Sequence, residues 1–302
     1  MMSDHTADKT SATRTTGSAG TGRRRAGLGR GLLRSLSLWI PIALLVIWTV
    51  LPFLVTISIS LKTPGEVYAV PTLLPRTPTF GPYIEVWSNP SFRSALLNSV
   101  IVGLGTTVLS LAIGVPAAYA FARFKFRGRH LLLLFTLIPR LIPGIGLLVP
   151  LYRIAATLGV LNSRLTLIVV YTGMLLPLAV WLMVGFFQQI PRELEEAATV
   201  DGATLFGRLR YILLPLTVPA LITIGVLSFR EAWNEFQLAL VLTSTPGKRT
   251  LPYELFLMQD ATGLPNLPAE AAFAIITVLP FVLIYVRIER FVVQGITSGA
   301  VK

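Results

Sequence analysis

Residues 35–61 read SLSLWIPIALLVIWTVLPFLVTISISL, and none of these 27 side chains carries a charge. An α-helix needs about 20 apolar residues to cross the hydrocarbon core of a bilayer. The run is also longer than the apolar core of a cleavable signal peptide, which holds about 7–15 residues. We therefore predict that this stretch is a membrane-spanning helix.

Five further apolar runs follow along the chain. They occupy residues 94–122, 131–151, 165–190, 216–242 and about 271–288. Continuous helices suit such runs because lipid cannot satisfy open backbone groups, whereas a membrane barrel would need alternating strands of about ten residues. Pro139 and Pro143 interrupt one run, which we expect to be kinked. The predicted fold class is an all-α, polytopic membrane protein with six transmembrane helices.

The composition of the whole chain agrees with a membrane protein. Of the 302 residues, 53% are hydrophobic and 13% are charged, and the mean hydropathy is +0.71. Soluble domains carry about 25% charged residues, so a water-soluble enzyme is disfavoured. The chain has no cysteine and only two histidines, His5 and His130. Thiolate chemistry is excluded, a multi-histidine metal site is disfavoured, and we expect no cofactor.

The net charge of +12 reflects 26 Lys and Arg against 14 Asp and Glu. Such a surplus suits either nucleic-acid binding or cytoplasmic loops beside membrane helices. With a cytoplasmic N-terminus, 17 Lys and Arg lie on the cytoplasmic side and 7 on the other, while Arg140 and Arg230 lie inside spans. We therefore place both termini in the cytoplasm. No nucleic-acid-binding module is recognisable, so nucleic acid is not an expected partner.

The chain is predicted to have three parts. Residues 1–34, rich in Ser, Thr, Gly and Arg, form a disordered basic cytoplasmic tail because they cannot bury enough apolar surface to become ordered. Residues 35–288 form the six-helix transmembrane domain, which includes a polar cytoplasmic loop at 191–215. Residues 289–302 form a short cytoplasmic C-terminal tail.

The polar loop has the signals of a bent helical pair. Residues 190–219 read IPRELEEAATVDGATLFGRLRYILLPLTVP. Pro191 and the glutamates that follow suit the start of a helix, Gly202 suits a turn with positive φ, and Thr204 suits a second helix start. The product is a compact helix–turn–helix that could dock a soluble partner. An ordinary amphipathic connector at the membrane surface would show the same features.

The same loop resembles the EAA signature of ABC importer permeases, which is Glu-Ala-Ala, three residues, Gly, nine residues, Ile, one residue and Leu-Pro. The matching residues are Glu196, Ala197, Ala198, Gly202, Ile212, Leu214 and Pro215. The variant Asp201-Gly202-Ala203 is similar to the carbohydrate (maltose-type, MalG-like) family. The segment WNEF at 233–236 and the last residues, GITSGAVK at 295–302, agree with that family. The resemblance covers roughly residues 35–302.

The resemblance implies the ABC type I importer permease (MetI-like) architecture in a bacterial cytoplasmic membrane. It implies a sister permease subunit in a heterodimer, two ABC ATPase subunits and an extracytoplasmic solute-binding protein, all around a core embedded in membrane lipid. A sugar or oligosaccharide would move inward by alternating access. Residues 62–93 and 243–270 are candidate landing loops for the binding protein.

The resemblance also assigns roles within the loop, which would be the coupling helix of the family. Glu196 would make a polar contact with the ATPase, Ala197 and Ala198 would pack closely, and Gly202 would provide the bend. The full set of coupling residues is Glu196, Ala197, Ala198, Asp201, Gly202, Ala203, Ile212, Leu214 and Pro215. Within the C-terminal tail, Gly295, Thr297 and Ser298 are candidate contacts with the ATPase interface.

The chain itself lacks the phosphate-binding loop of an ATPase. That loop reads G-x-x-x-x-G-K-[ST], whereas Gly247-Lys248 is followed by Arg249 and has no suitably spaced glycine before it. We therefore expect no enzyme activity in this chain and assign ATP hydrolysis to partner subunits.

Polar side chains inside the spans are candidates for the translocation pathway, because ionisable groups in lipid are costly unless they face water or a partner. The polar candidates are Arg140, Glu231, Asn234 and Glu235, and Trp233 is a further candidate because its aromatic ring could stack on a sugar ring. A purely structural role, with these groups solvated or paired near a helix end, is the competing interpretation.

Two other functions remain open at this point. An ABC permease for a solute other than a sugar would share the coupling loop. An ion-coupled secondary transporter would use Glu231 and Glu235 to carry the coupling ion. An intramembrane enzyme has no support, since no Ser-His or paired-aspartate element is recognisable.

Overall fold

The computed structural model describes residues 23–69, 72–259 and 265–300, with the side chains of 23–38, 259, 284 and 288–300 outside that description. Every regular element in the described residues is a helix. The elements are α1 (Arg23–Ser60), α2 (Pro64–Ala69), α3 (Gly81–Ser88), α4 (Pro90–Arg123), α5 (Arg129–Phe135), α6 (Ile138–Leu141), α7 (Gly144–Thr157), α8 (Arg164–Gln189), α9 (Glu193–Val200), α10 (Leu205–Arg208), η1 (Leu209–Leu213), α11 (Leu214–Leu216), α12 (Val218–Asn234), α13 (Gln237–Leu242), η2 (Pro246–Lys248), α14 (Leu251–Gln259) and α15 (Leu267–Ala300).

Four helices are long and apolar enough to cross a membrane. They are Trp39–Ser60, Pro90–Arg123, Arg164–Gln189 and Leu267–Arg287. Two bent pairs bring the number to six if each pair is one span. Helices α5 to α6 meet α7 at 93°, and the stretch from α10 to α11 meets α12 at 80°. The all-helical class is therefore confirmed, and the kink expected from Pro139 and Pro143 is present.

The run at 216–242 is not one straight helix. Helix α12 ends at Asn234, Glu235 has an extended backbone, and α13 resumes at Gln237. The sequence run showed only that these residues are apolar, and it gave no sign of the break. The Glu235 side chain at the break accepts hydrogen bonds from the N–H groups of Leu238 and Ala239.

The chain divides into two units, residues 1–55 and residues 56–302. In the first unit, the large apolar side chains of α1 from Trp39 onward are exposed, and Trp48 is 82% exposed. Exposed apolar side chains along a whole helix suit contact with lipid. Helix α1 begins at Arg23, inside the tail expected at 1–34, while residues 1–22 lie outside the described residues.

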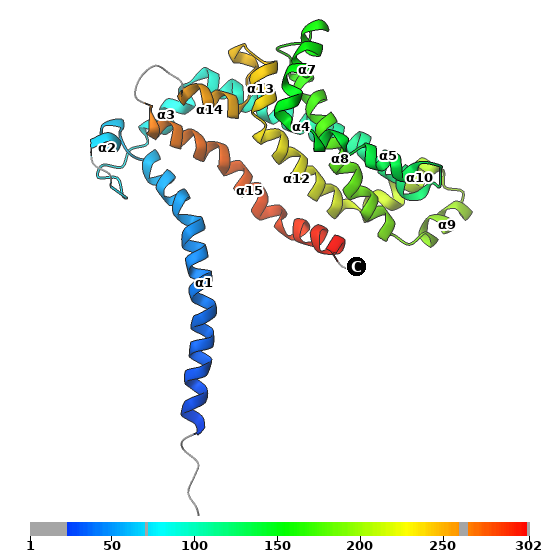
Figure 1. The fold of residues 1–302 in the computed structure, drawn as a ribbon, viewed down its shortest axis with the longest axis horizontal. Coiled ribbons are helices and arrows are strands. Elements are labelled where there is room, and N and C mark those ends of the chain that lie inside the picture. Colours follow the sequence, from blue (N-terminus) through cyan, green and yellow to red (C-terminus); the bar gives the residue numbers. More distant parts are fainter. Residues whose placement is uncertain (1–22, 70–71, 260–264, 301–302) are drawn as a thin grey trace, which may run out of the picture. The chain divides into compact units, whose positions relative to one another are not determined.

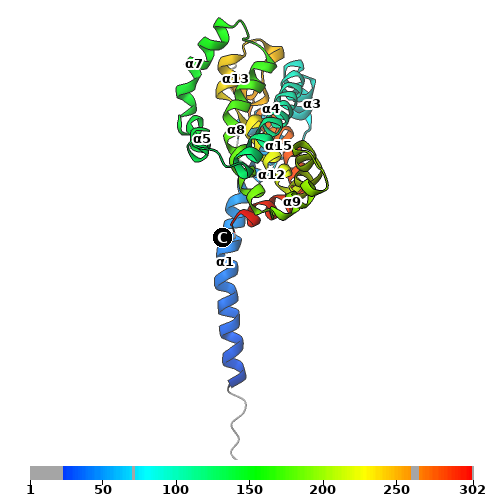
Figure 2. The same ribbon diagram turned by 90° about the vertical axis from the view of Figure 1, so that its right-hand side faces the viewer.

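In the second unit, α4, α8 and α12 form the centre, as both views of the ribbon show (Figures 1 and 2). Small residues let these helices approach closely. A Cβ added at Gly103 on α4 would lie 2.6 Å from the Phe229 ring of α12, and one at Gly114 would lie 3.2 Å from Cβ of Ala179 on α8. Larger side chains at either glycine would push the helices apart.

One hydrophobic cluster fills the end of this bundle nearest α9. It gathers buried side chains of α4, α8, η1 and α12, among them Ala118, Tyr119, Phe187, Leu213 and Ile224. This cluster supports the loop that carries the EAA-like residues. The other end of the bundle holds a cluster built around Phe92, Trp233 and Phe273.

Candidate functional site

Helix α9 lies near the start of the segment 191–215, which we call the coupling loop after the role that the resemblance implies. Three glutamates in its first turn, Glu193, Glu195 and Glu196, lie at the positive end of the helix dipole. Only Glu195 and Ala198 of this helix are buried, at positions i and i+3 that share one face. The opposite face of α9 is therefore available for contact.

The bend after α9 is a Schellman turn. Gly202 has φ +83°, its N–H donates to the Thr199 carbonyl at 3.1 Å, and the Ala203 N–H donates to the Ala198 carbonyl at 2.9 Å. A residue with a side chain is strained at that φ, so the turn favours glycine. The bend expected at Asp201-Gly202 is present in the structure, and Asp201 is the residue that ends the helix.

The second helix of the loop starts with the cap expected from the sequence. The Thr204 side chain accepts a hydrogen bond from the Gly207 N–H at 3.1 Å, which satisfies one of the free donors of the helix start. Across the bend, the Arg208 guanidinium donates to Oγ1 of Thr199 at 2.9 Å. The two arms of the loop are thus tied to each other.

The chain returns to the bundle through a π-helical turn, η1. Leu209 and Leu213 of this turn are buried, and Ile212 and Leu214 are partly buried. Leu214 packs against the hydrophobic cluster, while Pro215 is exposed at the start of the bend into α12. The Leu position of the EAA-like signature therefore packs against the bundle, and the Ile position is partly buried beside it.

Glu195 attaches the other arm. Its Oε1 lies 2.5 Å from Nε of Arg123 on α4, and its Oε2 accepts a hydrogen bond from the Tyr119 hydroxyl at 2.9 Å. The Arg123 Nη2 also donates to the Ile190 carbonyl at 2.9 Å. This carboxylate is a functional candidate that the sequence reasoning missed. Glu195 lies three residues before Ala198 and therefore shares a helix face with it, and this spacing could have indicated that Glu195 faces the bundle.

Several large apolar side chains of the loop are exposed. Val200 is 88% exposed, Tyr211 73% and Phe206 67%, and Glu196 and Ala197 are exposed on the same loop. Large apolar side chains grouped at a surface and rimmed by charge mark an interaction site. The geometry suits docking of a protein partner.

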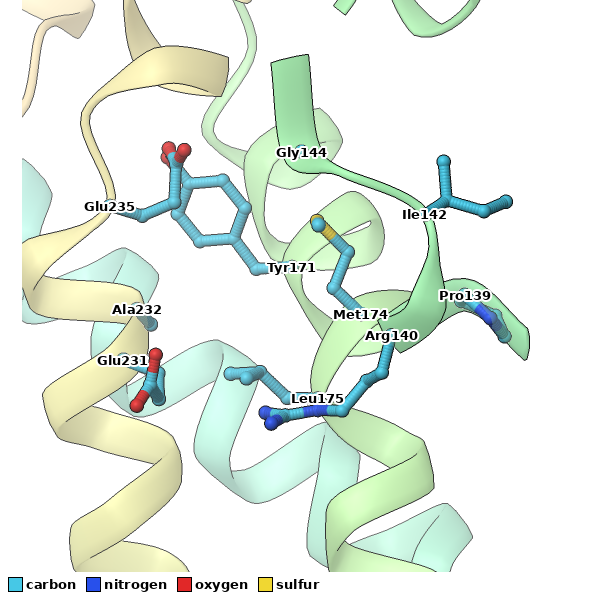
Figure 3. A pocket seen from close by; sticks show the side chains of 10 residues that line it. All are labelled: Pro139, Arg140, Ile142, Gly144, Tyr171, Met174, Leu175, Glu231, Ala232 and Glu235. Carbon is cyan, nitrogen blue, oxygen red and sulfur yellow. The ribbon is translucent and has the colours of Figure 1, made fainter. Parts of the chain in front are cut away.

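A cavity of about 280 Å³ lies among α6, α8 and α12. Ten residues line it, and Figure 3 shows their side chains; they are Pro139, Arg140, Ile142, Gly144, Tyr171, Met174, Leu175, Glu231, Ala232 and Glu235. Three of the five pathway candidates, Arg140, Glu231 and Glu235, therefore share one cavity. They come from spans that are separated in sequence.

Glu235 holds the broken helix together. Its carboxylate accepts hydrogen bonds from the Tyr171 hydroxyl at 2.6 Å, the Leu238 N–H at 2.9 Å and the Ala239 N–H at 3.1 Å. The two amides belong to the first turn of α13, where free donors await an acceptor. Glu235 thus serves as the cap of α13 and as a tie between spans.

The charges of Arg140 and Glu231 are arranged differently. Glu231 pairs with the exposed Arg230 at 2.5 Å. In the part of the chain that the structure describes, no side chain pairs or hydrogen-bonds with the Arg140 guanidinium. In Figure 3 this guanidinium extends from α6 into the cavity, toward the side that carries Glu231. Of the three charges that line the cavity, the Arg140 guanidinium is therefore the one without a described side-chain partner, whereas Glu231 and Glu235 are already engaged.

Two other pathway candidates lie elsewhere. Trp233 is buried in the hydrophobic cluster around Phe92 and Phe273, against Phe229 and Phe281. Asn234 is exposed, and its amide donates to the Arg230 carbonyl at 2.8 Å. The structure does not bring either residue to the cavity. The side chains of Gly295, Thr297 and Ser298 lie outside the described residues, although their backbone belongs to α15.

Part of the loop 243–270 is fixed to the other end of α4. The Asn98 amide donates to the carbonyls of Gly247 and Arg249 at 3.0 and 2.7 Å, and Oγ of Ser99 accepts from the Leu251 N–H at 2.8 Å. Beyond this anchor, burial raises the pKa of the Glu254 carboxyl, and the positive charge of Arg249 partly opposes that rise. Within the described residues, no group of His, Asp or Glu is placed to hold a metal ion.

Comparison with known proteins places this arrangement among transporters. The family model described as "Binding-protein-dependent transport system inner membrane component" matches residues 110–298. The chain is 37% identical over 271 residues to the trehalose transport system permease protein SugB of Mycobacterium tuberculosis, covering 89% of this chain and 98% of that protein.

Two further proteins are similar to the chain. The sulfoquinovosyl glycerol transport system permease protein SmoH of Agrobacterium fabrum is 39% identical over 244 residues, covering 80% of this chain and 85% of SmoH. A crystal structure of a bacterial ABC transporter involved in alginate import has a chain with a TM-score of 0.74 and 22% identity, covering 91% of this chain and 99% of that one. The last likeness establishes a shared fold.

Proposed function

The chain belongs to the family of binding-protein-dependent transport system inner membrane components, and from this premise we propose that it carries a sugar or oligosaccharide into the cell. The observation that carries the substrate class is the 37–39% identity to permeases named for trehalose and for sulfoquinovosyl glycerol. Each aligned region covers at least 80% of the chain, so it contains the coupling loop and the residues that line the cavity.

The proposal includes the finer architecture of an ABC type I importer permease. Six spans result if each bent pair crosses the membrane once. The distribution of Lys and Arg supports both termini in the cytoplasm, with the coupling loop on that side. A sister permease would complete the membrane core as a heterodimer, two ABC ATPase subunits would bind below it, and an extracytoplasmic solute-binding protein would deliver the sugar.

In the proposed mechanism, closure of the ATPases on ATP displaces the coupling loop. The exposed apolar face around Val200 and Phe206 is the surface that the ATPase would contact, with Glu196 at its edge. The displacement would reorient the bundle as a rigid body and switch the pathway between inward- and outward-facing states. Arg140 and Glu231 would meet the sugar hydroxyls in the cavity. The C-terminal residues Gly295, Thr297 and Ser298 stay candidate contacts of the ATPase interface.

Reconstitution tests this function directly. The chain would be co-purified with its ATPase, sister permease and binding protein and placed in proteoliposomes, with radiolabelled trehalose and maltose as probes. We expect uptake that requires ATP and disappears when the ATPase carries a substitution in its phosphate-binding lysine. Uptake by this chain alone, driven by a proton or sodium gradient, would overturn the proposal in favour of a secondary transporter. ATP-driven uptake of an amino acid but of neither sugar would overturn the substrate class.

A further inference from the structure

We propose that helix α4 is a rod that joins the coupling loop to the outer loop 243–270, with Glu195, Arg123 and Tyr119 as its inner joint. The proposal rests on the proposed function, in which an ATPase displaces the coupling loop. It adds the route of that displacement, which passes from the Glu195 carboxylate into α4 and along α4 to residues 247–251.

The inner joint engages both oxygens of one carboxylate. Oε1 of Glu195 lies 2.5 Å from Nε of Arg123, and Oε2 accepts from the Tyr119 hydroxyl at 2.9 Å. Both partners belong to the last two turns of α4. Arg123 also donates to the carbonyl of Ile190, the residue directly after α8. A single guanidinium therefore joins α4, the end of α8 and α9.

The inner joint is shielded from water. The side chains of Arg123 and Glu195 are 9% and 8% exposed. Opposite charges attract more strongly in such surroundings than in water, and the planar guanidinium fixes the direction of the contact. Helix α9 cannot slide past α4 without separating these charges and leaving each of them unpaired.

The outer joint lies near the first turns of α4. The buried Asn98 amide holds the carbonyls of Gly247 and Arg249, and the buried Ser99 hydroxyl accepts from the N–H of Leu251. These bonds reach the loop that we propose as a landing surface for the binding protein. One helix thus makes specific polar contacts with a loop at each of its ends.

The length and continuity of α4 suit this role. At 1.5 Å per residue, the distance along the helix from Ser99 to Arg123 is roughly 36 Å, which exceeds the hydrocarbon thickness of about 30 Å. Figure 1 shows α4 as one continuous helix with α9 near one end and α14 near the other. The loop also returns to the bundle through α12, but an 80° bend separates those elements. Helix α4 has no such break between Pro90 and Arg123, and Pro116 lies inside it.

The first test measures sugar uptake per ATP hydrolysed in the reconstituted importer. Glu195→Gln keeps the side-chain shape and removes the charge, and we expect uptake per ATP to fall about fivefold or more while the ATPase still co-purifies. Tyr119→Phe removes one hydrogen bond and keeps the ring, so the fall should be smaller. Arg123→Lys restores the charge without the guanidinium and should recover part of the loss seen with Arg123→Gln.

A matched substitution inside α4 controls for general damage. Thr107 makes a hydrogen bond within the helix, to the Gly103 carbonyl at 2.8 Å, and contacts neither loop by a hydrogen bond. Thr107→Val should leave uptake per ATP at the wild-type value. Ser99→Ala at the outer joint should lower it. The double variant with Glu195→Gln should be no worse than the stronger single variant, because both changes interrupt one route.

The second test measures rigidity itself. The chain has no cysteine, so cysteines introduced at Glu193 on α9 and at the 65%-exposed Val108 on α4 accept spin labels selectively. We expect the distance between the labels to be the same in the nucleotide-free and ATP-bound assemblies. In the Glu195→Gln background, the distance distribution should broaden.

Two outcomes would overturn the proposal that α4 acts as a rod. One is a label distance that changes between the nucleotide states of the wild-type assembly. The other is wild-type uptake per ATP in Glu195→Gln and Ser99→Ala. Both outcomes leave the proposed function standing, because that function fails only if the wild-type assembly shows no ATP-driven sugar uptake.

Discussion

Helices α7 and α9 are followed by turns of the same type, although the two helices lie in different parts of the bundle. Gly159 follows α7 with φ +67°, and Gly202 follows α9 with φ +83°. In each turn the glycine N–H donates to a carbonyl three residues earlier at 3.1 Å. The next N–H in each turn donates to a carbonyl five residues earlier at 2.9 Å. The local hydrogen bonding of the two turns is therefore identical.

The surroundings of the two turns differ. After Gly159, the side-chain oxygen of Asn162 accepts from the N–H groups of Ser244 and Thr245 at 2.6 and 3.1 Å, which ties the turn to another loop of this chain. After Gly202, large apolar side chains such as Phe206 remain exposed. One turn is tied to another loop of its own chain, whereas the other belongs to the loop that we propose contacts the ATPase. The comparison teaches that a helix-ending glycine fixes local structure but does not assign a function.

Replacing each glycine by proline should separate these roles most clearly. Proline removes the N–H bond and forces φ near −65°, at a cost of about 3 kcal/mol or more. We expect Gly202→Pro to reduce ATP-driven uptake about 100-fold, the factor that corresponds to this energy. The amount of protein inserted in the membrane should be unchanged, as measured by immunoblotting.

Gly159→Pro is the matched control, because it breaks the same two-bond turn. Its ATP-driven uptake should stay close to that of the wild type, because the same strain then falls outside the coupling loop. Equal losses in both variants would show that local strain, and not the coupling loop, governs transport.

A second prediction concerns the exposed charge on α9. Glu196→Lys reverses a charge at the proposed ATPase contact and opposes the helix dipole. We expect the affinity for the ATPase to fall about tenfold, or about 1.4 kcal/mol, as measured by titration of the purified ATPase. Unchanged affinity and turnover would remove Glu196 from the contact and leave the apolar side chains as the docking surface.

A third prediction concerns the cavity, where the only change is the loss of a free cation. Arg140→Gln removes the guanidinium that no described side chain neutralises. Loss of a hydrogen bond to a polar solute costs about 1 kcal/mol, so the maximal uptake rate at saturating binding protein should fall about fivefold. Arg153→Gln provides the control, because Arg153 is exposed on α7 and does not line the cavity. Equal effects of both substitutions would point to net charge instead of the cavity.

The smallest expected effect comes from the hydroxyl of Tyr171. Tyr171→Phe deletes its hydrogen bond to Glu235 but leaves the two amide bonds to that carboxylate in place. We expect a loss of about 1 kcal/mol in stability, seen as a lower midpoint of thermal unfolding of the purified complex, with transport nearly unchanged. A large loss of transport with an unchanged midpoint would give Tyr171 a direct role in the pathway.

The two glutamates that follow each other on α9 show what a sequence signature can and cannot reveal. The signature predicts a role for Glu196, which the structure places at the exposed face. It is silent on Glu195, whose partners Arg123 and Tyr119 come from a span more than 70 residues earlier. Arg123 itself belongs to a basic run that predicts orientation. Its neighbours Lys125, Arg127 and Arg129 line an open basic cavity together with His130 and Arg192.

The fifth apolar run, residues 216–242, also shows a feature of the fold that the sequence did not predict. Its hydrophobicity predicted a span, which α12 and α13 partly fulfil. At the break, the Glu235 carboxylate accepts hydrogen bonds from the Tyr171 hydroxyl and from two amides of the next helix. The sequence analysis did not predict this break. Trp233 and Asn234, predicted beside Glu235 in one polar group, separate because successive helical residues point in different directions.

The sequence by itself determined the all-helical membrane class, the kink at Pro139 and Pro143, the turn at Gly202 and the cap at Thr204. These features depend on hydrophobicity, covalent geometry and hydrogen bonds between residues close in the chain, so a linear reading contains them. Only the tertiary structure decided which carboxylate anchors the coupling loop, which charges share a cavity and where the fifth run breaks. The first two depend on atoms that are far apart in the chain and meet only when the helices pack together, and at the break the Tyr171 hydroxyl adds a long-range hydrogen bond to two local ones.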